Sequence, residues 1–177
     1  MPLAIFGYVL AAAVMVAGFF ATATFGGSHG EIPYAKNLLG GLTFAYGSAI
    51  GAHVYVFSED VFSLLRSPEM LSFALLCSLN ITAIDLWEHS RRAGDPEVGA
   101  TDELTLTLPL ALLAGFALLF ALQAGPDSPL RPFYVAILVA TAGLLGINRV
   151  QHRLPADALW LAADACLLAP WLYVVLA

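Results

Sequence analysis

The stretch LTLTLPLALLAGFALLFALQ, residues 104–123, contains no charged side chain. A helix of roughly 20 mostly apolar residues is long enough to cross the hydrocarbon core of a bilayer. The whole chain shares this character, because 60% of its 177 residues are hydrophobic and only 11% are charged, and its mean hydropathy is +0.83. A soluble domain of this size could not bury so much apolar surface. The sequence therefore predicts an all-α integral membrane protein.

Polar and turn-forming clusters divide the chain into about six apolar blocks, each near the length of one membrane span. Charged side chains and irregular backbone are not tolerated in hydrocarbon, so these clusters mark the connections between helices. The expected spans are residues 2–22, 37–57, 70–87, 104–123, 133–150 and 158–176. The connections leave no room for a soluble domain. We therefore expect one transmembrane domain over residues 1–177, folded as a polytopic helical bundle.

The distribution of basic residues predicts the orientation of the chain. The first, third and fifth connections hold five lysines and arginines, whereas the second and fourth hold two. Because basic residues favour cytoplasmic loops, the odd connections are expected in the cytoplasm and both termini outside it. The frequent alanine, leucine, glycine and arginine residues and the short loops favour a bacterial inner membrane.

A polar cluster ends the third apolar block, in the segment LNITAIDLWEHSRRAGDP at residues 79–96. On a helix Asp85, Glu88 and His89 share one face. One interpretation is structural: Glu88 pairs with Arg92, Asp85 bonds His89, and the arginines anchor the helix at the membrane surface. The other is a Mg²⁺ site that also contacts phosphate oxygens, because carboxylates suit a hard cation. A zinc hydrolase is less favoured, since no other helix offers a histidine-rich partner.

Two further polar residues lie inside expected spans. Asp164 would cost about 2.5–3.5 kcal/mol if it faced lipid, so we expect it to line a cavity or to bond Asn148, His53 or a backbone group. His53 could ligate haem or a pigment, but a hydrogen-bonded interior histidine is the more frequent arrangement. The glycines and the serine within residues 40–51 predict close approach of a neighbouring helix.

Two stretches resemble the UbiA-type membrane prenyltransferases. Residues 32–51, IPYAKNLLGGLTFAYGSAIG, are similar to the part of that family in which an aromatic residue and a lysine precede a glycine-rich helix. Residues 76–95, LCSLNITAIDLWEHSRRAGD, are similar to the helix and loop that carry its second aspartate-rich motif. The resemblance implies an all-helical membrane fold that transfers a prenyl group from a diphosphate, with Mg²⁺ and the diphosphate held by two acidic motifs. It covers only the last six of that family's nine helices.

The chain departs from the family pattern at both motifs. The first motif has no counterpart, and the second is degraded, with Asn80 and Glu88 approximately where the family has aspartates. The residues and the resemblance together predict three sets of site residues. The metal positions are Asp85, Glu88 and Asp95; the diphosphate contacts are Lys36, Arg91 and Arg92; the cavity-lining residues are Asn80, His53 and Asp164.

These observations leave two hypotheses of different classes. The first is a UbiA-like membrane protein that holds an isoprenoid in a lipid-open cavity and is catalytically incomplete; an active form would be a Mg²⁺-dependent prenyltransferase that needs the missing upstream helices. The second is a non-catalytic subunit of a larger membrane complex that binds lipid, quinone or pigment. Either class implies membrane lipid or isoprenoid ligands and partner membrane proteins, and neither implies nucleic acid.

Overall fold

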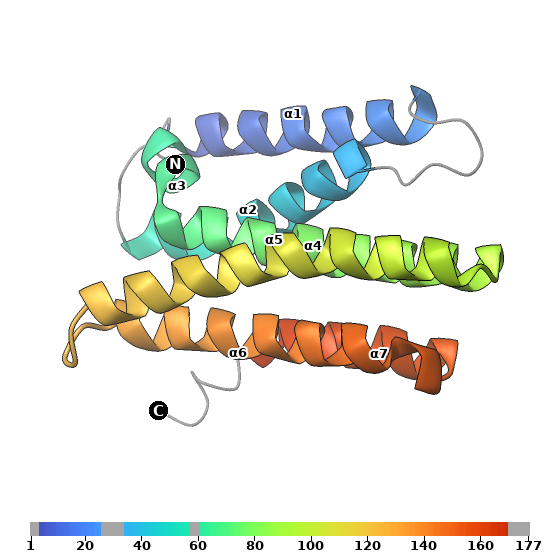
Figure 1. Cartoon of the computed structure of the whole chain (residues 1–177). Helices are drawn as coiled ribbons and strands as arrows, with labels where there is room; N and C mark the ends of the chain where they lie inside the picture. The colour runs from blue at the N-terminus through green and yellow to red at the C-terminus, as the bar shows by residue number, and fades with distance from the viewer. Residues whose placement is uncertain (1–3, 26–33, 57–60, 170–177) are drawn as a thin grey trace. The chain divides into compact units, whose positions relative to one another are not determined.

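The computed structural model describes residues 4–25, 34–56 and 61–169, and helices are the only regular secondary structure in them (Figure 1). The elements, in chain order, are α1 (Ala4–Phe25), α2 (Tyr34–Val56), α3 (Val61–Arg66), α4 (Pro68–Ala93), α5 (Pro96–Gln123), α6 (Leu130–Val150), the 3₁₀ helix η1 (Gln151–Arg153) and α7 (Ala156–Leu167). The all-α prediction is therefore confirmed for the described part of the chain.

Four segments are long and apolar enough to cross a membrane: Ile5–Thr24 in α1, α4, α5, and Leu130–Arg153, which covers α6 and η1. They indicate a helical integral membrane protein. The remaining two expected spans correspond to α2 and to α7 with the residues after it. The start of the first expected span and the ends of the second and sixth lie outside the described residues, so the count of six spans stays a prediction.

Helices α4 and α5 extend well beyond the expected spans. We expected a long connection over residues 88–103, but α4 continues to Ala93 and α5 begins at Pro96. Charged residues are compatible with helix once the helix has left the hydrocarbon, so polarity alone did not mark the helix ends. The tight turn depends on Gly94, whose φ of 64° is left-handed, a conformation that glycine adopts without steric cost.

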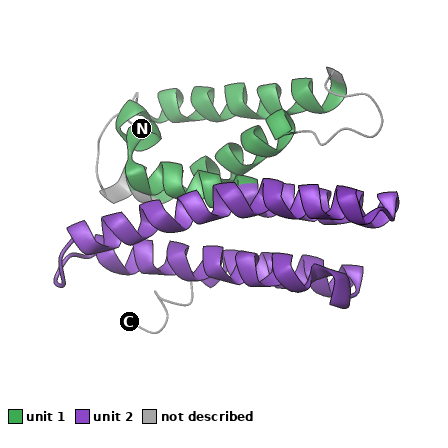
Figure 2. Cartoon of the chain, viewed as in Figure 1, with its two compact units in different colours: residues 1–78 green, residues 79–177 purple. Residues whose placement is uncertain are grey.

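The described chain divides into two compact units, residues 1–78 and 79–177, and the boundary lies within α4 (Figure 2). In the first unit α1 and α2 pack together around a buried cluster that includes Tyr8, Tyr46 and Leu64. The Tyr46 hydroxyl donates to the Tyr8 carbonyl oxygen at 3.1 Å. A buried phenol with a partner fixes two helices without leaving an unsatisfied polar group. The single domain predicted from the sequence stays a prediction.

One glycine of α2 sets the distance between α2 and the first half of α4. A Cβ on Gly41 would lie 2.7 Å from Ser78 Cα, which is closer than van der Waals contact permits. The Ser78 hydroxyl lies 2.7 Å from the Ala74 carbonyl oxygen, to which it donates. The expectation of close helix approach is confirmed at Gly41. It is wrong at Gly47 and Gly51, which have no described neighbour within 4 Å of the same position.

The second unit contains the end of α4, α5, α6, η1 and α7. Helices α5 and α6 pack against each other along their length, and α7 packs on α6. Each helix contributes a stripe of buried residues at helical spacing. On α5 the stripe is Leu106, Leu110, Leu113 and Ala117, and on α6 it is Ile137, Ala140, Thr141 and Leu144. This core positions one end of α4, α5 and α6 around the site described next.

Candidate functional site

The turn between α4 and α5 forms one side of the site. Gly94 ends α4, and its backbone N–H donates to the Ser90 carbonyl oxygen at 3.2 Å. Asp95 caps α5, because its side chain accepts from the Glu97 backbone N–H at 2.9 Å. Pro96 follows at the first helical position, where its missing N–H costs nothing. These local rules explain why a helix end with several charges makes a tight, ordered turn.

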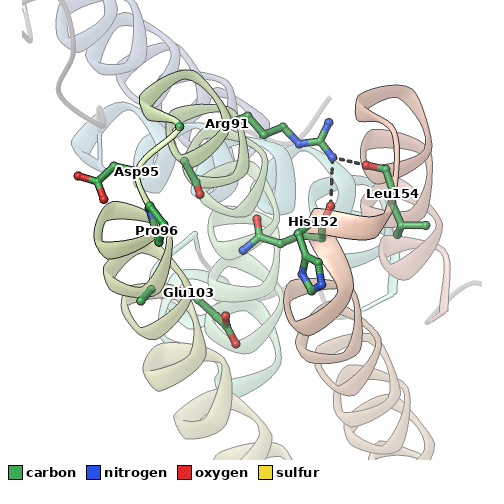
Figure 3. Close-up of a pocket in the computed structure, with 11 residues that line it drawn as sticks. Arg91, Asp95, Pro96, Glu103, His152 and Leu154 are labelled. Carbon is green, nitrogen blue, oxygen red and sulfur yellow. Dashed lines mark hydrogen bonds between the residues drawn. The ribbon is translucent and has the colours of Figure 1, made fainter.

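An open pocket of about 640 Å³ lies between this turn and η1 (Figure 3). Its polar lining residues are Ser90, Arg91, Asp95, Glu103, Gln151 and His152. Figure 3 shows His152 on the η1 wall, with Asp95 on the outer side of the turn. Pockets of roughly 300–1,000 Å³ with a few placed polar groups are typical of small-molecule sites.

Arg91 connects the two walls of the pocket. Its Nη2 donates to the Gln151 carbonyl oxygen at 3.1 Å and also to the Leu154 carbonyl oxygen. These are the dashed lines in Figure 3. A guanidinium has five N–H donors in a fixed plane. The N–H groups of Arg91 that do not bond the two carbonyl oxygens can therefore bond a ligand. The same side chain can therefore position η1 and contact an anion.

A second pocket of about 590 Å³ adjoins the first and shares Ala100 and Glu103 with it. Its other lining residues are Leu104, Thr107 and Arg149. Leu104 and Thr107 lie further along α5, within its apolar part. The two pockets thus lie next to each other on α5, and we call them together the depression; the larger is at the polar helix ends and the smaller reaches the apolar part of α5.

A buried hydrogen-bond network lies beneath the pockets and joins three helices. The Trp87 indole Nε1 donates to Asn148 Oδ1 at 2.9 Å. The Asn148 amide in turn donates to the Glu103 carbonyl oxygen and to Thr107 Oγ1, each at 3.1 Å. Trp87 and Asn148 are 2% and 1% exposed. Because a buried network with good geometry resists distortion, it holds the backbone of Glu103 in place relative to α4 and α6.

A second polar contact joins α4 to α5. His89 Nδ1 lies 2.8 Å from Asp102 Oδ2, and Asp102 is buried. The structural interpretation of the sequence paired His89 with Asp85; the structure pairs it with Asp102 instead. Asp102 was overlooked because residues 88–103 were expected to be a loop, whereas α5 already begins at Pro96. Asp85 itself is half-buried on α4.

The other half of that interpretation is confirmed, since Arg92 Nη2 lies 3.7 Å from Glu88 Oε2 within α4. Arg92 does not line either pocket. Of the three expected metal positions, only Asp95 borders the larger pocket. Among the residues that the structure describes, no three histidine, cysteine, aspartate or glutamate side chains are grouped to hold a metal ion. The Mg²⁺ site at Asp85, Glu88 and Asp95 stays a prediction.

The expected cavity-lining residues lie apart from these pockets. Asn80 Nδ2 donates to Asp164 Oδ1 at 3.5 Å, whereas Asp164 was expected to bond Asn148, His53 or backbone. His53 belongs to the first unit, where its Nε2 lies 3.2 Å from Ser63 Oγ. The contact agrees with a hydrogen-bonded interior histidine, and whether His53 ligates haem or a pigment is not tested by it. Lys36, the remaining diphosphate candidate, is half-buried near the start of α2, also in the first unit.

Sequence reasoning missed four polar residues of the larger pocket: Ser90, Glu103, Gln151 and His152. Glu103 follows Asp95 by eight residues, a spacing of about two helical turns. Recognising Asp95–Pro96 as a helix start would have placed both on α5. The segment after residue 150 offered no such signal, because its contacts with Arg91 join residues about sixty positions apart.

Comparisons of the chain with protein-family models, with curated proteins and with solved structures find no match. The fold and composition by themselves define the class: a helical integral membrane protein with a polar pocket at one end of its helices.

Proposed function

We propose that this chain is a UbiA-related membrane protein that binds an isoprenoid lipid by its diphosphate group, with Mg²⁺, at the pocket between the α4–α5 turn and η1. Binding, without prenyl transfer by this chain alone, is the proposed activity, because the first acidic motif of the family has no counterpart here. The observation that supports it best is the combination of Arg91, His152 and Glu103 in one pocket.

The charges of the pocket make the proposed binding dependent on a cation. The pocket has two acidic side chains, Asp95 and Glu103, against one arginine, Arg91. A bare diphosphate would meet two carboxylates and would be repelled. Mg²⁺ in proteins typically takes one or two carboxylates together with phosphate oxygens and water. Glu103, with Asp95 at the rim, fits that donor set. A bound Mg²⁺ would offset the repulsion between the diphosphate and these carboxylates.

The adjoining pocket favours a lipid over a soluble diphosphate. It shares Glu103, adds Arg149 as a second cation, and continues past Leu104 along α5. Leu104 and Leu108 are 59% and 58% exposed, and in a bilayer such residues meet lipid. A ligand with a charged head and an apolar chain therefore fits the whole depression, whereas a nucleotide would occupy only its polar end.

The test uses the full chain in lipid nanodiscs and radiolabelled geranylgeranyl diphosphate as the probe. Wild-type protein should bind the probe with Mg²⁺ and lose the binding in EDTA. Glu103→Gln should weaken Mg²⁺-dependent binding about tenfold, the equivalent of roughly 1.4 kcal/mol. Glu97→Gln is the matched control, because Glu97 lies in the first turn of the same helix but lines neither pocket.

Adjacent arginines give a second matched pair. Arg91→Gln should reduce binding, whereas Arg92→Gln should leave it within about twofold. Inorganic diphosphate as competitor separates head-group recognition from partition of the chain into lipid. Equal binding with and without Mg²⁺, or equal loss in both arginine variants, would contradict the proposal and favour the alternative of a non-catalytic structural subunit.

A further inference from the structure

A polar contact lies at the middle of α4, far from the pockets. Asn80 is the thirteenth of the 26 residues of α4, so about 18–20 Å of helix lies on each side of it at 1.5 Å per residue. The hydrocarbon core is about 30 Å thick. If α4 spans the bilayer, Asn80 lies near its centre. Asp164, bonded to Asn80 at 3.5 Å, lies at the same depth.

Asp164 lies between two exposed leucines on one face of α7, and Asp157 lies on the same face nearly two turns earlier. Leu161 and Leu168 precede and follow it at helical spacing and are 73% and 56% exposed. Asp164 is itself exposed. We call these three residues, Leu161, Asp164 and Leu168, the Asp164 face. On the opposite side, α7 packs closely on α6, because a Cβ on Gly143 would lie 2.8 Å from Cys166 Sγ. The Asp164 face is thus turned away from α6.

Asn80 is a second, independent indication that a hydrogen-bond donor is missing near the middle of α4. It is 2% exposed, and its Oδ1 is buried without a hydrogen-bond partner among the described residues. Buried acceptors without partners are infrequent and costly. Asn80 and Asp164 together present more acceptor oxygens than the described residues satisfy, and the exposed carboxylate of Asp164 is the one that a donor from another helix can reach.

This chain has no lysine or arginine in the right place to be that donor. Asp164 takes part in neither of the two ion pairs seen in the second unit, His89 with Asp102 and Arg92 with Glu88. All seven basic residues lie within a few residues of a helix end: Lys36, Arg66, Arg91, Arg92, Arg131, Arg149 and Arg153. A second copy of the chain would bring only another Asp164 to this depth, and two carboxylates repel.

We infer that the Asp164 face docks a transmembrane helix of a different protein, and that this helix carries a lysine or arginine near its middle. Charge complementarity identifies the partner's chemistry, because a carboxylate facing lipid is unfavourable and a paired one between helices is not. The flanking leucines supply the packing surface. The inference does not depend on the diphosphate site, which lies at the end of the helices.

The probe is a synthetic membrane helix of alternating leucine and alanine with one central lysine, and its control has leucine at that position. Association with the labelled full chain in liposomes is followed by energy transfer. The lysine helix should bind about tenfold more tightly than the leucine helix. Asp164→Asn should remove this preference. Asp157→Asn, in the first turn of the same helix, should preserve it.

A stability measurement covers the case in which Asp164 is simply structural. Asp164→Asn should leave the thermal midpoint of the isolated chain unchanged or raise it, because the amide oxygen still accepts from Asn80 while the charge is removed. Equal binding of both helices to the wild type, a preference that survives in Asp164→Asn, a lowered midpoint in Asp164→Asn, or Asp164-dependent association of two copies would each overturn the inference.

Discussion

Replacing Trp87 and Asn148 together should cost less stability than the two single replacements added together. The Trp87 N–H donates to Asn148 Oδ1 at 2.9 Å, and both residues are almost fully buried. Asn148→Leu leaves that N–H without an acceptor and also removes two bonds to α5. Trp87→Phe leaves the Asn148 oxygen without its donor. An unsatisfied buried polar group costs about 1–3 kcal/mol.

We expect Asn148→Leu to lower the free energy of unfolding by about 2–3 kcal/mol and Trp87→Phe by about 1–2 kcal/mol. In the double variant neither orphaned group remains. Its loss should therefore be smaller than the sum by about 1 kcal/mol. Equilibrium unfolding by SDS in dodecyl maltoside micelles, followed by far-ultraviolet circular dichroism, measures all three values. Trp160→Phe is the matched control, because Trp160 is 44% exposed on α7 and should change stability by less than about 0.5 kcal/mol.

Additive losses, within about 0.3 kcal/mol, would refute this reasoning. They would mean that the indole and the amide do not interact in the native protein, and that the backbone of Glu103 is not held by this network.

Two further predictions use the same unfolding measurement. Gly41→Ala should lower stability by about 1–3 kcal/mol, because the new methyl group meets the backbone of Ser78 and backbone cannot move aside easily. Gly47→Ala, with open space around it, should raise stability by up to about 1 kcal/mol. The reverse order of the two stabilities would contradict the packing of α2 on α4. His89→Leu should lower stability more than Asp102→Asn, because the first leaves a buried carboxylate without its partner and the second leaves only a neutral amide. Equal losses of stability would contradict a stabilising contact between His89 and Asp102.

The helical fold follows from the sequence because hydrocarbon leaves few alternatives. In residues 104–123 no charge or turn interrupts the apolar run, so α5 was predictable in type and approximate place. Its true beginning at Pro96 was not, because the charged residues before 104 were taken for a loop. The decisive local signals were Gly94, Asp95 and Pro96, which together stop one helix and start the next. Capping chemistry, more than hydropathy, fixes this boundary.

The site was less predictable because its contacts join distant parts of the chain. The pair of Glu88 with Arg92 is local and was expected from the spacing. The partner of His89 is thirteen residues away across a turn, and Arg91 reaches carbonyl groups about sixty residues further on. Spacing on one helix cannot reveal such partners. It takes the packing of α5 on α6 to bring η1 opposite the α4–α5 turn.

The length of α5 has a consequence for how the protein responds to its membrane. Its 28 residues extend about 42 Å, whereas the hydrocarbon core is about 30 Å thick. The acids of its first two turns make this the end that projects, and Glu103 lies near the level at which α5 leaves the lipid. Hydrophobic mismatch is relieved by tilting helices or by deforming the bilayer. Longer acyl chains would then bring the head-group region up around the mouth of the pocket, and shorter chains would leave it open to water. Acyl chain length would thus control access to the pocket without any change in its residues.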